Sequence, residues 1–137
     1  MCRLATAGDP LFETSDLEVN RGGPSYTIDT ARELARTGWE KVHWLIGADM
    51  LMYLPKWHQP SELLRELNFI VMARPGWAIE WDALPPNFQA LRANVVQAPL
   101  IDISSSEIRH RAAAGLSVNY LTAPAVGEYI REYSLYR

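Results

Sequence analysis

The densest group of residues that could do chemistry lies between Ile103 and Arg109, where three consecutive serines precede Glu107. The spacing Ser104-x-x-Glu107 is a capping box and predicts that a helix begins here. Hydroxyl groups beside the unpaired backbone N–H groups and the positive dipole end of a helix suit phosphate oxygens, and Arg109 can hold phosphate with its planar fork. The segment therefore predicts a polyphosphate site. A capped surface helix with a solvated arginine is the alternative that the spacing leaves open.

A second group follows an apolar run at residues 42–47, which is typical of a strand buried on both faces of a parallel sheet. Ligands of open α/β sheets bind beyond the carboxyl ends of the strands. Gly47 would let a ligand approach the backbone there, and Asp49 could accept hydrogen bonds from ribose hydroxyls. The alternative is a glycine that ends the strand and an aspartate that caps the next helix.

An aromatic loop, Leu54-Pro55-Lys56-Trp57-His58-Gln59-Pro60, is held between two prolines. A tryptophan in a rigid loop offers a flat face for stacking, and Lys56 could neutralise an anion. The alternative is that Trp57 only covers the core. His43 and His58 lack metal-ligand spacing to another histidine or to a carboxylate, so we predict no metal site formed by protein side chains.

The last two groups are turns. Residues 22–27, Gly-Gly-Pro-Ser-Tyr-Thr, run into a predicted helix and could present backbone N–H groups to a carboxylate, with Ser25 as an ordinary N-cap as the alternative. Arg74-Pro75-Gly76 is a basic turn after an apolar strand and suggests phosphate. Taken together, anion donors, a ribose acceptor and an aromatic ring at strand ends predict nucleotide binding.

The elements that must position these residues alternate between strands and helices. Strands are predicted at Leu17–Val19, 42–47, 68–73 and 95–98, with a further apolar segment at 101–103. Helices are predicted over 25–36, over 61–66 after Pro60, from Ser104 to Gly115, from Pro124 onward, and more briefly over 87–92. This alternation predicts an α/β fold, a Rossmann-like parallel sheet with flanking helices.

Composition restricts the class of protein. The chain has 137 residues, 48% of them hydrophobic, which is enough for one domain with a core. Its 13 basic and 16 acidic residues give a net charge of −3, so we expect no nucleic-acid or anionic-membrane partner. The single cysteine, Cys2, excludes an internal disulfide framework and suits the reducing cytoplasm. No apolar run reaches the ~18 residues of a membrane span.

Six segments closely resemble, in order, those of the bacterial nicotinate-nucleotide adenylyltransferases, which belong to the nucleotidyltransferase superfamily. The resemblance extends from about Leu4 to Arg137. The segments are Ser25-Tyr26-Thr27-Ile28-Asp29-Thr30, Ile46-Gly47-Ala48-Asp49-Met50, Leu54-Pro55-Lys56-Trp57, Phe69-Ile70-Val71 with Arg74-Pro75-Gly76, Ile103-Ser104-Ser105-Ser106-x-Ile108-Arg109, and the tail from Tyr120-Leu121 to Leu135-Tyr136.

The resemblance implies a reaction in which ATP, with Mg²⁺, and nicotinate mononucleotide give deamido-NAD and pyrophosphate. It implies that Trp57 stacks on the pyridine ring and that backbone N–H groups of Thr27 and His58 hold the nicotinate carboxylate. The remaining implied substrate-binding residues are Tyr26, Lys56 and Arg74. The implied ATP-binding residues are Gly47, Asp49, Ile103, Ser104, Ser105, Ser106 and Arg109, with Ser106 and Arg109 as the catalytic pair. Ser106 stands where many relatives have threonine, which keeps the hydroxyl.

One departure from the family concerns its amino-terminal strand, glycine-rich turn and H-x-G-H segment, because nothing in this chain matches them. We therefore expect an N-terminally incomplete nucleotidyltransferase domain over residues 1–137, the carboxyl-terminal two-thirds of such an enzyme, with weak or no turnover. Unpaired apolar sheet edges make homo-oligomers an expectation. The alternatives are a non-catalytic nucleotide-binding module and a sister adenylyltransferase for another phosphorylated acceptor.

Overall fold

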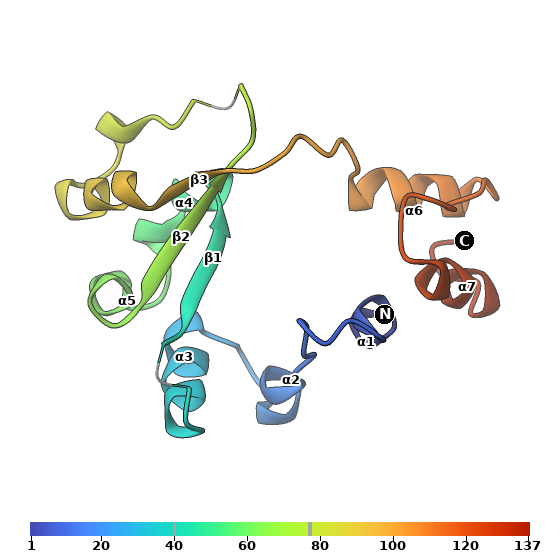
Figure 1. Ribbon diagram of the computed structural model, residues 1–137, viewed down its shortest axis with the longest axis horizontal. Helices are drawn as coiled ribbons and strands as arrows, with labels where there is room; N and C mark the ends of the chain where they lie inside the picture. Colours follow the sequence, from blue (N-terminus) through green and yellow to red (C-terminus); the bar gives the residue numbers. More distant parts are fainter. Residues whose placement is uncertain (40, 77) are drawn as a thin grey trace. The chain divides into compact units, whose positions relative to one another are not determined.

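The computed structural model describes residues 1–39, 41–76 and 78–137, which form two compact units (Figure 1). One unit, the sheet unit, comprises Leu17–Leu100. The other, the helical unit, combines Met1–Asp16 with Ile101–Arg137. The expectation of a single domain over residues 1–137 stays a prediction.

The sheet unit is built on three parallel strands in the order β1-β2-β3 (Figure 1). They are β1 (His43–Gly47), β2 (Asn68–Ala73) and β3 (Val95–Gln97). Gly47 is aligned with Met72, and Met72 with Val96, so the carboxyl ends of the strands lie at one edge of the sheet. The prediction of a parallel α/β sheet with flanking helices is confirmed.

Helices cover one face of this sheet. They are α3 (Thr27–Arg36), α4 (Ala48–Leu51), α5 (Pro60–Glu66) and the 3₁₀ segments η1 (Leu54–Lys56), η2 (Trp81–Ala83) and η3 (Pro86–Asn94). Their apolar side chains meet the inward side of β1 and β2 in one core, which excludes water from that face. Members of that core are Ile28, Ile46, Ala48, Leu51, Leu54, Leu63, Phe69, Val71, Ala73, Leu84, Phe88 and Leu91.

The opposite face of the sheet is open, which corrects the prediction that the strand at residues 42–47 is buried on both faces. Leu45 is 59% exposed, Met72 37% and Val96 52%. The alternation of side chains sends Ile46 into the core and Leu45 to the other side, where no described element of the sheet unit covers it. The apolar run therefore predicted the strand correctly, but it did not predict that only one face of the strand is covered.

The predicted strand at Leu17–Val19 is wrong, because these residues begin the helix α2 (Leu17–Arg21). Val19 is 81% exposed, so the segment has no apolar face to add to the sheet. Glu18 and Arg21 are instead spaced so that both side chains reach α3. Within the described chain, residues 101–103 also form no strand, and Ile101 and Ile103 are exposed.

The helical unit contains α1 (Cys2–Thr6), α6 (Ser105–Ala113) and α7 (Pro124–Glu132). The predicted starts at Ser104 and Pro124 are confirmed. Gly115 ends α6 with φ +70°, and the N–H of Leu116 donates to the Arg111 carbonyl at 2.8 Å, as in a Schellman motif. A small core of Ala112, Val118, Val126 and Ile130 joins α6 to α7. No described helix of either unit is both long and apolar enough to cross a membrane.

Candidate functional site

The turn formed by residues 22–26 leads into α3, and no described side chain caps the first turn of that helix. Gly22 and Gly23 have φ of +69° and +70°, which glycine adopts at little cost. The N-cap is Tyr26 rather than Ser25, so the alternative of Ser25 as an ordinary cap is wrong. In the described chain no side chain accepts from the first turn of α3, and Thr27 is its first residue. Uncapped N–H groups at a helix start can hold an anionic oxygen.

The aromatic loop lies against this turn. The rings of Tyr26 and His58 stack with centroids 4.2 Å apart and planes inclined by 27°. Trp57 is half-buried and packs against the core of the sheet unit, which holds its ring in place while leaving part of it exposed. The Lys56 ammonium lies 5.8 Å from the centre of the exposed Tyr53 ring. The structure therefore brings the segment with Tyr26 and Thr27 to the segment with Trp57 and His58, although the stacked residues Tyr26 and His58 are 32 positions apart in sequence.

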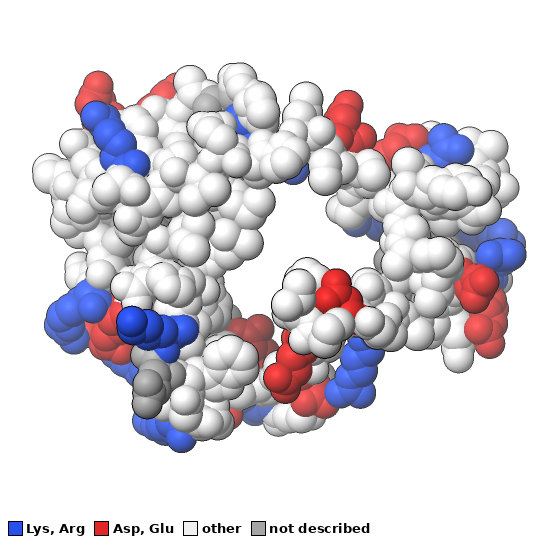
Figure 2. All heavy atoms as spheres, in the orientation of Figure 1, with Lys and Arg blue, Asp and Glu red and all other residues white. Residues whose placement is uncertain are grey.

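An ion pair fastens α3 to α5 next to the aromatic loop. Arg32 donates to the two carboxylate oxygens of Glu66 at 2.9 and 2.8 Å, and its third nitrogen lies 3.5 Å from the Gln59 amide oxygen. The hydrogen bonds from Arg32 lower the pKa of Glu66 to about 2. Gln59 Nε2 lies 3.1 Å from His58 Nε2. Figure 2 shows such mixing of basic and acidic side chains over the face in view.

The carboxyl edge of the sheet carries the second predicted group. Gly47 ends β1, and Asp49 lies in the first turn of α4 with its carboxylate next to Gly47. A Cβ atom at Gly47 would be in steric conflict with a carboxylate oxygen of Asp49, so any other residue here would require the Asp49 side chain to move. Arg74 follows β2 and is exposed at the same edge, since β1 and β2 are parallel neighbours. An acceptor and a cation are thus available where ligands of such sheets bind.

The serine segment opens α6 in the helical unit. Ser104 is the N-cap, and its Oγ accepts from the Glu107 N–H at 3.1 Å, as the capping box predicts. The Glu107 carboxylate turns instead toward Arg111, 3.8 Å away. Arg109 donates to Ser106 Oγ at 3.1 Å, and both side chains are exposed on the first two turns. The hydroxyls, N–H groups and guanidinium that phosphate needs therefore lie at one helix end.

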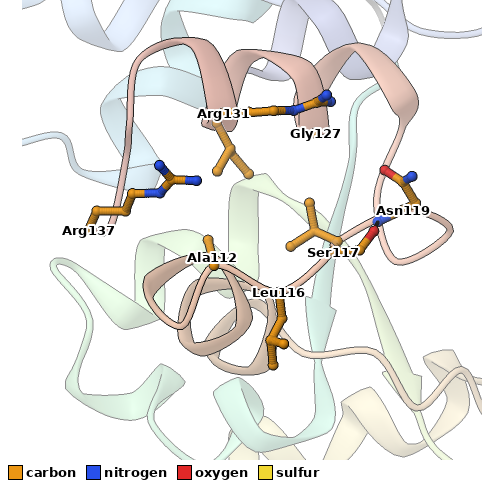
Figure 3. A pocket seen from close by; sticks show the side chains of 10 residues that line it. Ala112, Leu116, Ser117, Asn119, Gly127, Arg131 and Arg137 are labelled. Atoms are coloured by element: carbon orange, nitrogen blue, oxygen red, sulfur yellow. Dashed lines mark hydrogen bonds between the residues drawn. The ribbon is translucent and has the colours of Figure 1, made fainter.

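A cavity of about 270 Å³ lies elsewhere in the helical unit, between α6 and α7. Figure 3 shows Gly127 and Arg131 on the α7 side and Ala112 and Leu116 on the α6 side. None of the sequence-predicted site residues lines it. Its ten lining residues are Ala112, Gly115, Leu116, Ser117, Val118, Asn119, Gly127, Ile130, Arg131 and Arg137.

Sequence reasoning missed a polar network between α2 and α3. Arg21 reaches Glu33 Oε2 at 2.5 Å and Thr30 Oγ1 at 3.1 Å, and Thr30 donates to Glu18 Oε1 at 2.6 Å. Thr30 is the one buried polar side chain in the described part of the protein, 7% exposed. The available signal was the spacing of three between Glu18 and Arg21 and again between Thr30 and Glu33, which places each pair on one helix face.

Comparison with known proteins identifies relatives of this arrangement. A family model described as cytidylyltransferase-like matches residues 1–111. The chain is 42% identical over 139 residues to a probable nicotinate-nucleotide adenylyltransferase of Roseiflexus sp. (strain RS-1) and 41% identical to that of Herpetosiphon aurantiacus. These matches cover 100% and 99% of this chain and 70% of each relative.

Solved structures share the fold. Plasmodium falciparum nicotinic acid mononucleotide adenylyltransferase complexed with NaAD matches with a TM-score of 0.60 and 21% identity, over 82% of this chain and 58% of that one. The same enzyme complexed with APC matches with a TM-score of 0.55 over 83% of this chain and 58% of that one. The chain thus spans less than two-thirds of the length of these structures.

Proposed function

This chain belongs to the cytidylyltransferase-like family and, within it, to the nicotinate-nucleotide adenylyltransferases, and from this premise we propose that it serves adenylyl transfer from ATP to nicotinate mononucleotide. The products are deamido-NAD and pyrophosphate, so the reaction belongs to NAD biosynthesis. One observation within the sheet unit carries the proposal: the Tyr26–His58 stack joins the uncapped start of α3 to the loop that holds Trp57. A flat aromatic ring beside free N–H groups fits a pyridine that carries a carboxylate.

The sheet unit would bind the mononucleotide. Trp57 would stack on the pyridine ring, and the backbone N–H groups of Thr27 and His58 would hold the carboxylate. Tyr26 would keep these two segments together through its stack on His58. Lys56, released from the Tyr53 ring, and Arg74 would neutralise phosphate. Gly47 and Asp49 would line the nucleotide ribose region as part of the proposed ATP-binding set. The carboxamide of nicotinamide has one acceptor oxygen, so it would match one of the two N–H donors and turn its own NH2 donor toward the other, which favours the acid.

The start of α6 would bind ATP. Ile103 and Ser104 would lie near adenine, and Ser105, Ser106 and Arg109 would hold the phosphates. The mononucleotide phosphate oxygen would attack the α-phosphorus in line, and the bond from that phosphorus to the leaving pyrophosphate would break without a covalent intermediate. Catalysis of this kind rests on positioning and on neutralising developing charge, which is the role proposed for Ser106 and Arg109.

Mg²⁺ would enter as its complex with ATP. Magnesium usually keeps several waters and binds substrate phosphates rather than a cage of protein ligands. The described residues contain no group of three or more histidine, cysteine or carboxylate side chains that could hold a metal, which fits this mode of entry. When bound, Mg²⁺ would neutralise phosphate charge. The chain's own contribution is to orient the phosphates through Ser105, Ser106 and Arg109.

We place the protein in the cytoplasm on the strength of its single cysteine. Besides ATP and nicotinate mononucleotide, we propose a second copy of this chain as a partner. The unpaired edge of β1 and the open apolar face beside it support that proposal.

Ligand binding and pyrophosphate release test the proposed function separately. Nicotinate mononucleotide is titrated into the chain while tryptophan fluorescence is followed, and the chain is then incubated with ATP, Mg²⁺ and nicotinate mononucleotide while pyrophosphate is assayed. We expect saturable binding and weak or no turnover, because no H-x-G-H segment occurs in the chain. An amino-terminal extension carrying that segment should restore turnover.

Three outcomes separate the candidates. Absence of saturable mononucleotide binding would contradict the proposed substrate. Binding that stays without turnover even in the extended protein would favour a non-catalytic nucleotide-binding module. Strong turnover by the chain as it stands would show that the histidine segment is dispensable. An Arg109→Gln variant provides the internal check, because it should weaken ATP binding and leave mononucleotide binding unchanged; the matched control is Arg131→Gln in α7.

A further inference from the structure

In the network between α2 and α3, the donor and the acceptor of each hydrogen bond are fixed by the chemistry of the side chains. A guanidinium only donates hydrogen bonds and a carboxylate only accepts them. Thr30 Oγ1 therefore accepts from Arg21 and must give its single proton to Glu18. Arg21 also donates twice to Glu33, so all four side chains have one consistent arrangement. Replacing the Thr30 hydroxyl would remove the donor that Glu18 uses in this network and would leave Arg21 bonded to Glu33 alone.

Thr30 connects this network to the turn that begins α3. Its side chain is held by α2, and its backbone N–H donates to the Tyr26 carbonyl at 3.2 Å. Residues 22–26 are all exposed, and Gly22 and Gly23 add conformational freedom. The turn thus lacks a core of its own, and its path is set by what holds its two ends. Arg21 holds one end and Thr30 the other.

We propose that Thr30 and Arg21 are positioning residues that set the selectivity of the site for a pyridine mononucleotide with a carboxylate over one with a carboxamide. The inference rests on the proposed function and deepens it. With the network intact, the turn keeps Tyr26 stacked on His58. The backbone N–H groups of Thr27 and His58, each next to or part of that stack in sequence, can then converge on one carboxylate. With the network broken, the glycine turn is free to move and the two donors separate. Separating the two donors should lower the affinity for a ligand with a carboxylate more than for one with a carboxamide, because hydrogen bonds to charged groups are stronger.

The test compares Thr30→Val, which keeps the shape and removes the hydroxyl, with Thr30→Ser, which keeps the hydroxyl. Dissociation constants are measured by isothermal titration calorimetry for nicotinate mononucleotide and for nicotinamide mononucleotide, and thermal stability is recorded for each variant. We expect Thr30→Val to weaken the binding of nicotinate mononucleotide about tenfold and to change the binding of nicotinamide mononucleotide much less. Thr30→Ser should keep the selectivity of the unmodified chain.

Arg21→Lys provides a second variant at a less buried residue of the network, for the case that Thr30→Val does not fold. Lysine keeps the positive charge but lacks the planar guanidinium that bonds to both Thr30 and Glu33. It should therefore also lower the selectivity for nicotinate over nicotinamide mononucleotide. Asp16→Asn is the matched control, since it removes an exposed ion pair with Arg3 in the helical unit and should leave selectivity unchanged.

Unchanged selectivity in Thr30→Val and in Arg21→Lys would overturn the inference. An equal loss for both mononucleotides together with a lower melting temperature would also overturn it, because that pattern is a purely structural effect. If the unmodified chain fails to bind nicotinate mononucleotide, the proposed function itself fails, and this inference with it. The two failures are therefore distinguished by the unmodified chain alone.

Discussion

Trp57 combines a fixed position with a partly exposed ring, which is what a stacking residue needs. It follows Pro55 at the end of η1, its N–H donates to the Leu54 carbonyl at 3.1 Å, and one part of its ring packs on the core. Little side-chain freedom is then left to lose when a ligand binds. The ring can contribute to affinity without a large ordering cost.

We therefore predict that Trp57→Ala weakens the binding of nicotinate mononucleotide by about tenfold or more, the usual range for loss of one stacking ring. Trp57→Phe should retain most of the affinity because it keeps a flat ring. Isothermal titration calorimetry measures both. Trp39→Ala, at an exposed tryptophan of the same unit, is the control and should bind normally. Unchanged affinity in Trp57→Ala would favour a different phosphorylated acceptor.

At the scale of elements, the Arg32–Glu66 pair joins α3 to α5 and has a defined pH dependence. The pKa of Glu66 falls from its ordinary 4.5 to about 2, chiefly through hydrogen bonds from Arg32. Since the folded pKa lies below the ordinary value, the stabilisation is complete above pH 4.5 and is lost as the pH falls toward 2.

Titration of the Glu66 side-chain carboxyl by NMR should therefore give a midpoint near 2, and Arg32→Gln should return it toward 4.5. Arg3→Gln removes an ion pair in the helical unit and should leave the Glu66 midpoint unchanged. A midpoint near 4.5 in the unmodified chain would mean that the pair is not formed in solution.

Replacing glycine by alanine should have opposite effects on stability at Gly115, which follows α6, and at Gly127, which lies inside α7. Gly115 has φ +70° and open space where a Cβ would lie, so Gly115→Ala should cost about 1 kcal/mol through backbone strain alone. Gly127 lies inside α7, and its Cβ would meet Val118 Cγ2 at an ordinary 3.5 Å. Gly127→Ala should therefore stabilise the chain by ~0.5–1 kcal/mol. Thermal unfolding of both variants checks the opposite signs, and a loss in both would contradict them.

Local chemistry made several elements predictable from sequence. The capping serine at 104, the prolines at 60 and 124 and the apolar run at 68–73 each act through neighbours in the chain, and those elements begin where expected. Leu17–Val19 was predicted as a strand because three residues are too few to show the periodicity of a helix. The contacts that hold α2 in place come from residues 30 and 33 on another helix. Non-local partners of this kind leave little trace in a short segment.

The candidate site was predictable as a set of residues and not as an arrangement. Tyr26 and His58 were both chosen from their loops, but their stack depends on the path of α3 and β1 between them. The Thr30 network was missed because a threonine inside a helix looks ordinary until its burial is known. Apolar Leu45 likewise indicates a strand and says nothing of whether a helix covers that face.

At the scale of the whole molecule, the open face of the sheet bears on the proposed second copy of the chain. Leu45 on β1 and Val96 on β3 are more than half exposed, and these are the two outer strands of the sheet. In the described structure β1 pairs with β2 on one side only. An exposed apolar face beside an unpaired strand edge is a typical surface for self-association. The net charge of −3 is too small to oppose it strongly.

We predict that sedimentation velocity shows the chain associating as its concentration rises, and that Leu45→Lys shifts it toward the monomer. Lysine places a charge in the middle of the apolar face, and burying that charge between copies would be costly. Val19→Lys is the matched control, because Val19 is also an exposed apolar residue but lies on α2, away from the sheet, and should leave association unchanged. A chain that stays monomeric at every concentration would contradict the proposed second copy. Equal effects of the two lysines would instead assign the change to net charge rather than to the sheet face.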